Sequence, residues 1–343
     1  MSERVARQDS APESIPGNVR ASASDSTTVS AGESAAPRSG RALVQLSGRN
    51  LLHGGGGRNI GLVVALVLLC IVGVVTAGDR FASGANVLTI LRLAAVIGVV
   101  SIGMTFVITG GGIDLSVGAM VALASVWATT LATQQMAADY HWIFMVTTAL
   151  LVGAACGLVN GLLVAYGRIV PFIATLAMLA GARGLAEILS DRKTQIITVN
   201  SFMDFFGGSV IGVPVLVWMF VLVAAAGWVL LNRTTFGRRT FAVGGNAEAA
   251  RLAGIKVQRH TVALYVLGGL CCGIAAVVIG GTLLSGGRGT IVGTVFGVLI
   301  FTTLNNVFTL NNLSISAQSV AKGLIIVIAV LLQQRLAARA TAP

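Results

Sequence analysis

The residues best suited to chemistry form a glycine-rich string followed by an acid, GGGIDLSVG, from Gly110 to Gly118. Three successive glycines favour the end of a helix, and Asp114 then stands where the next helix should begin. The sequence therefore predicts that Asp114 caps that helix. The alternative is a solute site, because an acid between apolar segments is costly and broken helices often line transport cavities. The residues of this candidate path are Gly111, Gly112, Asp114, Ser116 and Asn160.

A second string, GGNAEAARLAG, runs from Gly244 to Gly254 in a strongly basic loop. It predicts a turn, a short helix of good helix formers and a terminating glycine. A short capped helix standing away from apolar segments suits docking to a partner, and an ordinary loop helix is the alternative. Elsewhere, Arg183 and Glu187 are one helical turn apart, which predicts a structural ion pair.

No enzyme constellation is present in the sequence. His53, His141 and His260 are scattered and expected on loops, and there is no GxSxG, HExxH or phosphate-binding loop. The four cysteines lie in apolar segments without CxxC spacing, so they are interpreted as small buried hydrophobes. We expect no catalytic residue, metal or cofactor in this chain. If transport through this chain is energised by ATP, we expect a separate subunit to supply the ATPase.

Composition places the chain in a membrane. Of its 343 residues 55% are hydrophobic and 10% charged, with mean hydropathy +0.88, a balance that suits lipid rather than water. The sequence predicts an all-α, polytopic transmembrane helix bundle. Its nine expected spans are 60–77, 86–109, 113–133, 142–166, 170–190, 211–232, 261–283, 290–310 and 315–334.

The rest of the chain predicts two regions and one long loop. Residues 1–59 are rich in Ser, Ala, Gly and Arg, which predicts a disordered cytoplasmic tail. Residues 60–343 form the transmembrane domain, and its loop 233–260 holds six basic residues against one acid, Glu248. Such charge marks the cytoplasmic side. The net charge of +11 therefore reflects topology in a lipid membrane, and no nucleic-acid partner is expected.

Span counting and charge disagree about the C-terminus. Three spans follow Arg259, which would place Arg335 and Arg339 outside, whereas their charge favours the cytoplasm.

Helix packing is easier to anticipate. Gly153, Gly157 and Gly161 recur every fourth residue and predict close approach of a neighbouring helix. Gly293 and Gly297 repeat that spacing.

Four stretches of the chain, in order, resemble the ribose-type sugar permeases of bacterial ABC importers. They are GGGIDLSVGAMVALASV, VNGLLVAYGRIVPFIATLAML, RTTFGRRTFAVGGNAEAARLAGIKV and GGTLLSGGRGTIVGTVFGVLIFTTLNN. The resemblance implies about ten helices in the family, a multi-pass protein of the bacterial inner membrane, an ATPase subunit, a second permease copy and an extracytoplasmic sugar-binding protein. It also implies an ATPase-coupling loop, in which Glu248, Ala249, Ala250 and Gly254 match the EAA-xxx-G pattern and Gly244, Gly245 and Asn246 precede it.

One departure from the family lies near 273–274. In the family two helical stretches joined by an extracytoplasmic turn follow the coupling loop, whereas here they are fused into one stretch. We therefore expect a re-entrant hairpin from Val262 to Leu284, bent around Gly268, Gly269 and Gly273, which would reconcile the charge and the count. A plain single crossing is the alternative. The leading functional hypothesis is a permease for a monosaccharide or related polyol. Two other hypotheses are an ion-coupled secondary carrier and a transport-inactive membrane subunit.

Overall fold

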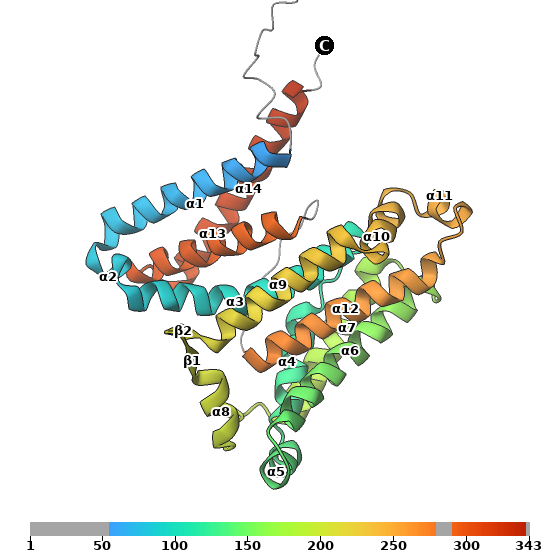
Figure 1. Ribbon diagram of the computed structural model, residues 1–343, viewed down its shortest axis with the longest axis horizontal. Coiled ribbons are helices and arrows are strands. Elements are labelled where there is room, and N and C mark those ends of the chain that lie inside the picture. Colours follow the sequence, from blue (N-terminus) through green and yellow to red (C-terminus); the bar gives the residue numbers. More distant parts are fainter. Residues whose placement is uncertain (1–54, 279–289, 341–343) are drawn as a thin grey trace, which may run out of the picture. The chain divides into compact units, whose positions relative to one another are not determined.

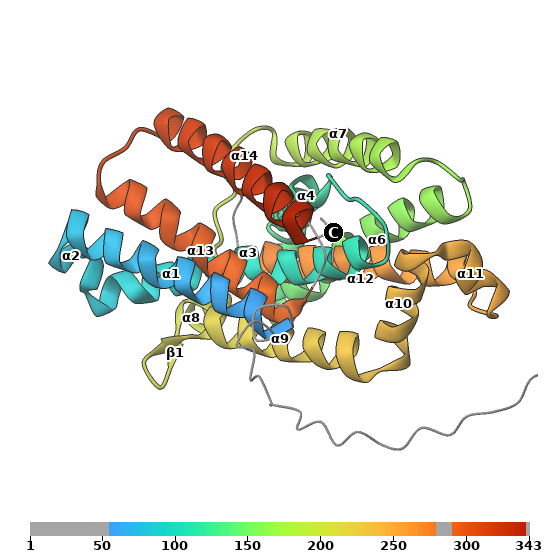
Figure 2. The same cartoon turned by 90° about the horizontal axis from the view of Figure 1, so that it is seen from above.

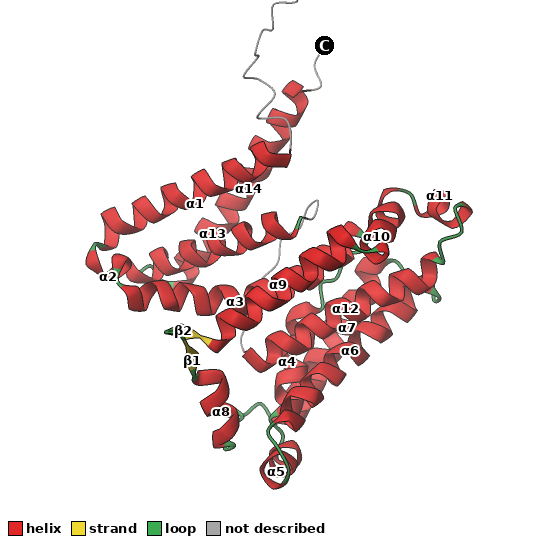
Figure 3. Cartoon of the chain, viewed as in Figure 1, coloured by secondary structure: helices red, strands yellow, loops and turns green. Residues whose placement is uncertain are grey.

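The computed structural model describes residues 55–278 and 290–340, which all belong to one compact unit. Helices make up nearly all of this part (Figures 1 and 3), and a two-stranded antiparallel pair is the one sheet within it. The all-α prediction is confirmed. Nearly all of the predicted tail lies outside the described residues, and the first helix begins at Gly55, before the expected Ile60. The elements are α1 Gly55–Ala77, α2 Asp79–Ala82, α3 Gly84–Thr109, α4 Val117–Ala128, α5 Leu131–Asp139, α6 Ile143–Ala165, α7 Pro171–Ser190, α8 Asn200–Gly207, β1 Ser209–Val210, β2 Val213–Pro214, α9 Val215–Arg233, α10 Thr235–Gly245, α11 Ala247–Leu252, α12 Val257–Val278, α13 Ile291–Leu310 and α14 Ile315–Ala340.

Seven helices in the described part are long and apolar enough to cross a membrane. They correspond to seven of the nine predicted spans, and α14 covers the ninth. The apolar runs predicted these helices well, because a span needs about 20 apolar residues and few other folds use such runs. The seven are α1, α3, α6, α7, α9, α12 and α13.

The predicted span 113–133 is bent in the structure, which divides it into α4 and α5. These helices meet at 55°, and the 12 residues of α4 would extend only about 18 Å. Two threonines cause the break. The Thr129 hydroxyl donates to the carbonyl oxygen of Ser125 at 2.9 Å, and the Thr130 hydroxyl caps α5 by accepting from the Thr133 amide.

Helix α6 packs against α12 (Figure 1), and its spaced glycines make the contact with a neighbouring helix that their spacing predicted. A methyl group on Gly157 would overlap the carbonyl oxygen of Tyr265, and one on Gly161 would lie 2.8 Å from the Cα of Val262. A methyl group on Gly153 would likewise overlap the Gly269 carbonyl. The two backbones are therefore in direct contact, which only glycine permits. By contrast, Gly297 on α13 has nothing within 4 Å of where its Cβ would stand, so the repeated spacing there makes no such contact.

Helix α12 is continuous, so the predicted hairpin is wrong. Its 22 residues run unbroken from Val257 through Gly268, Gly269 and Gly273 to Val278, and Val257–Val277 is itself long enough to span. The glycines taken as bend points are packing glycines instead. A methyl group on Gly273 would lie 2.6 Å from the carbonyl oxygen of Ala149 on α6.

Helix α13 runs parallel to α1. Near its start, the Cβ position of Gly293 lies 3.9 Å from Leu62, and near its end Asn311 donates to the Thr76 hydroxyl at 3.0 Å. Figure 2 shows the same two helices from above. The amides of Asn306 and Asn86 also exchange two hydrogen bonds between α13 and α3, at 3.0 and 2.7 Å. Asn306 therefore joins α13 to α3 through its side chain.

Helices α12 and α13 both run antiparallel to α3. Along α12, Leu264 lies against Gly110 and Cys271 against Gly103. Along α13, Thr294 bonds to Thr105 at 2.8 Å, and Asn306 to Asn86 as described above. Two successive apolar helices therefore point the same way. Residues 279–289, which join them, lie outside the described residues.

Candidate functional site

The break after α3 is built from glycine backbone. Gly111 has φ +83°, a conformation that side chains other than glycine rarely adopt. The amide of Gly112 then donates to the carbonyl oxygen of Val107 at 2.9 Å. A methyl group on Gly112 would lie 2.9 Å from the hydroxyl of Tyr265. The three glycines thus end α3 and let the chain pass close to α12.

Three residues of the candidate path, Asp114, Ser116 and Asn160, come together at this break. One Asp114 carboxylate oxygen accepts from the backbone amide and the hydroxyl of Ser116, at 2.8 and 2.6 Å. The Asn160 amide donates to the Ser116 hydroxyl at 3.0 Å and lies 3.5 Å from the other Asp114 oxygen. All three residues are buried, with 1%, 0% and 0% exposure. In this conformation the cluster is a closed hydrogen-bonded unit and presents no open solute surface.

The predicted capping role of Asp114 needs correction. The N-cap of α4 is Ser116, which makes no side-chain cap bond. Asp114 stands two residues earlier and fixes the turn that leads into the helix. A neighbouring polar atom, Oδ1 of Asn160, is buried without a hydrogen-bond partner among the described residues.

Sequence reasoning missed Tyr265 and misplaced His260. The Tyr265 hydroxyl donates to the carbonyl oxygen of Ile113 at 3.1 Å and so fixes the break to α12. A tyrosine inside an apolar span was the available signal, because a buried tyrosine usually bonds through its hydroxyl. His260 lies in α12 rather than on a loop; it is 8% exposed and 3.0 Å from the Thr240 hydroxyl.

The cluster leads to a prediction about Asp114. Replacement by Asn should keep most of the activity, because the Asn side-chain oxygen can still accept the two hydrogen bonds from the backbone amide and the hydroxyl of Ser116 that hold the turn. Replacement by Ala should cost about 1–3 kcal/mol for the buried groups left unpaired. Thermal unfolding of both variants in detergent, with solute uptake, measures this. Loss of uptake in Asp114→Asn, with normal assembly, would instead indicate a direct role in the solute path.

The segment 244–254 folds largely as predicted, with a shifted boundary. Gly244 and Gly245 end helix α10 rather than forming a turn. Asn246 alone separates α10 from α11, and its side-chain oxygen caps α11 by accepting from the Ala249 amide at 3.0 Å. Gly254 ends the segment with φ +84°, the left-handed geometry expected of a terminating glycine.

The charged side chains of α11 face outward. Glu248 and Arg251 form an ion pair, and each side chain is 65% exposed. The hydrogen bond from Arg251 holds the pKa of the Glu248 carboxyl below its usual range, so this acid remains ionised at neutral pH. Ala250 is buried and turns the opposite face of α11 inward. The segment therefore offers a small charged surface on an anchored helix.

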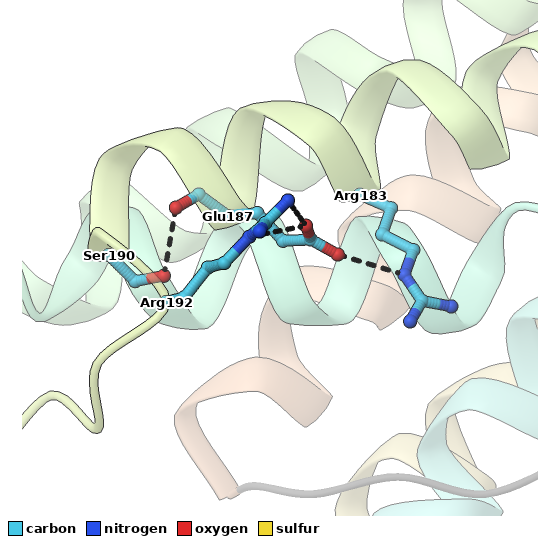
Figure 4. Close-up of polar contacts among 4 residues, drawn as sticks. All are labelled: Arg183, Glu187, Ser190 and Arg192. Carbon is cyan, nitrogen blue, oxygen red and sulfur yellow. Dashed lines mark hydrogen bonds and ion pairs between the residues drawn. The ribbon is translucent and has the colours of Figure 1, made fainter.

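Arg183 and Glu187 form the predicted ion pair, and Arg192 joins them (Figure 4). The Arg183 Nε and Arg192 Nη2 atoms each lie 3.2 Å from a Glu187 carboxylate oxygen. The three side chains are 73%, 81% and 40% exposed for Arg183, Arg192 and Glu187. Exposed pairs of this kind contribute up to about 1 kcal/mol. This acid is neutralised at the end of α7 and is not buried along an internal path.

This geometry defines a class: a polytopic helical membrane protein with a broken helix and a short exposed helix, α11, in its most basic loop. Residues 86–285 match the family described as the branched-chain amino acid transport system permease component. The ribose import permease protein of Bacillus subtilis is 39% identical over 306 residues, covering 81% of this chain and 92% of that protein. No solved structure matches the chain.

Other relatives carry different sugars in their names. The L-arabinose ABC transporter permease protein of Azospirillum brasilense is 35% identical, covering 80% of this chain and 87% of that protein. The fructose import permease protein of Rhizobium meliloti is also 35% identical, covering 79% and 84%. The chain belongs to this family of transport permeases, and it is a multi-pass protein of the bacterial inner membrane.

The comparison also bears on the length of the chain. The alignment with the Bacillus subtilis relative extends over 306 positions, whereas 81% of 343 residues is about 278. About 28 positions of the alignment therefore have no residue of this chain opposite them. That is enough chain for about one membrane crossing and a turn.

Proposed function

We propose that this chain is the permease subunit of an ABC importer and forms the path for a monosaccharide or related polyol across the inner membrane. The observation that carries the proposal is the 39% identity to a ribose import permease over 92% of its length. The described helices and the exposed segment α11 suit that role. The substrate is left at the level of a sugar, because the relatives above are named for ribose, arabinose and fructose.

The proposed assembly has three kinds of partner. ATP hydrolysis belongs to a separate ATPase subunit, since the sequence has no phosphate-binding loop of its own. A second copy of this chain completes the path as a homodimer. An extracytoplasmic binding protein delivers the sugar. The ATPase docks on α11, and closure of the ATPase changes which side of the membrane the path faces.

An ion-coupled secondary carrier is less well supported by the site. Such a carrier needs acids placed along an internal path, and the sequence offered Asp114 and Glu187. Glu187 is held by two arginines at the surface of α7, and Asp114 is closed into its cluster with Ser116 and Asn160. An ATP-driven importer needs neither acid for its energy coupling.

The docking role of α11 is tested by Glu248→Lys. The change replaces an ion pair by two like charges beside Arg251 and reverses the sign of the exposed acid, so the ATPase should bind at least about tenfold more weakly. Because both side chains are exposed, the chain should still insert and fold. Co-purification of the ATPase with tagged permease measures the effect.

Two controls give that result its meaning. Lys193→Glu reverses an exposed charge of another loop and should leave ATPase binding unchanged. If the wild-type chain captures no ATPase, the proposed function fails. If Glu248→Lys captures as much ATPase as the wild type and supports the same transport, only the assignment of α11 fails.

A further inference from the structure

Helix α10 is held firmly against two spans. Its Thr240 is fully buried and pairs with His260 of α12 at 3.0 Å. The ring of Phe236 lies 4.7 Å from the His260 ring and 6.2 Å from that of Phe106 on α3. A displacement of α10 must therefore also move side chains of α12 and α3, because closely packed elements do not deform continuously.

The end of α10 rests on the glycine break through backbone alone. A methyl group on Gly244 would overlap the carbonyl oxygen of Thr109 and lie 3.1 Å from the carbonyl carbon of Gly110. From the other side, a methyl group on Gly111 would lie 3.5 Å from the Cα of Gly244. The hydroxyl of Thr109, at the same place, is buried with no hydrogen-bond partner among the described residues.

On one side of this contact lies helix α11, where we propose that the ATPase docks. Only Asn246 separates α10 from α11, and its side chain caps α11. Glu248 is therefore four residues from Gly244. With so short and capped a connection, α11 and the end of α10 should move together.

On the other side lies the buried cluster. Two residues after Gly111, the carbonyl oxygen of Ile113 accepts from Tyr265 of α12. The next residue is Asp114, which bonds to Ser116 at the start of α4 and lies 3.5 Å from Asn160 of α6. The break thus connects the end of α10 to three further helices through a continuous series of contacts.

We propose that Gly244 is a positioning residue for transport: through its contact with Thr109–Gly111, movement of the docked helix α11 shifts the break that leads into α4. This inference rests on the proposed function, since it assumes an ATPase at α11. It adds the particular contact, between Gly244 and Thr109–Gly111, through which movement of α11 would reach the candidate path.

The test is Gly244→Ala in the complex with its ATPase. The new methyl group must push α10 away from Thr109, whereas the adjacent Gly245 has nothing within 4 Å of its Cβ position. Uptake per ATP hydrolysed should fall at least about tenfold more in Gly244→Ala than in Gly245→Ala, a typical size for coupling between two sites. Gly61→Ala, with open space on α1, serves as the control for the substitution itself.

A second measurement needs no variant. Hydrogen exchange of the wild-type complex with and without ATP should change together in the peptides that carry 107–113 and 240–252. The proposal is overturned if nucleotide changes exchange in the second peptide and leaves the first unchanged, or if Gly244→Ala folds, binds the ATPase and transports like Gly245→Ala. If the wild type neither binds an ATPase nor transports, the proposed function itself has failed.

Discussion

Gly157→Leu should prevent the membrane domain from folding. The substitution places a side chain where the Cβ alone would overlap the carbonyl oxygen of Tyr265, and backbone atoms of two packed helices cannot rotate away. Overpacking of well-packed cores costs about 1–3 kcal/mol when side chains can adjust, and more is expected here. We expect loss of monodisperse protein in detergent, or a large drop in the thermal unfolding midpoint.

The matched control is Gly61→Leu on α1, where nothing lies within 4 Å of the Cβ position. It adds the same side chain to a membrane helix and should fold like the wild type. Equal stability of the two variants would contradict the backbone contact between α6 and α12. Because that contact also places Asn160 and Tyr265, such a result would undermine the geometry of the break as well.

A cysteine at the end of α14 should be closed to reagents outside the cell. Helix α13 runs parallel to α1 and so heads outward if residues 233–260 face the cytoplasm. Helix α14 returns beside it, since Lys322 lies 5.9 Å from the ring of Phe301. The basic Arg335 and Arg339 then reach the cytoplasmic side, where positive charge is favoured.

The measurement is labelling of Ala340→Cys with a membrane-impermeant thiol reagent, in intact and in opened cells. The four native cysteines are first replaced by alanine. Lys193→Cys serves as the outside control and Leu252→Cys as the inside control, both at exposed positions. Prompt labelling of Ala340→Cys in intact cells would show that α13 and α14 cross the membrane in the opposite direction. That result would contradict the parallel arrangement of α12 and α13.

Sequence predicted the spans and the short helix α11 because both depend on local signals. Apolar length predicted α1, α3, α6, α7, α9, α12 and α13, and the spacing of Gly153, Gly157 and Gly161 predicted a contact before its partner was known. The asparagine cap and the terminating glycine of α11 also act within a few residues. These features need no knowledge of the rest of the fold.

The errors arose where tertiary contacts decide. Gly268, Gly269 and Gly273 resembled a bend, yet the α6 backbone lies against Gly269 and Gly273, which explains glycine in a straight helix. The break between α4 and α5 depends on two threonines that an apolar count ignores. The contact between Gly244 and Gly111 joins residues more than 130 positions apart, and no local pattern indicates it.

The central claim is that this shortened chain still transports a sugar by means of ATP, and uptake by the reconstituted complex tests it most directly. The permease, its co-purified ATPase and the binding protein would be placed in liposomes, and a panel of radiolabelled monosaccharides and polyols that includes ribose, arabinose and fructose would be offered one at a time. The account predicts that at least one sugar accumulates only with ATP inside and binding protein outside, and that a protonophore has no effect. Uptake that needs no ATP and collapses with the protonophore would indicate a secondary carrier. A correctly assembled complex that accumulates no member of the panel would contradict the account in favour of a transport-inactive subunit.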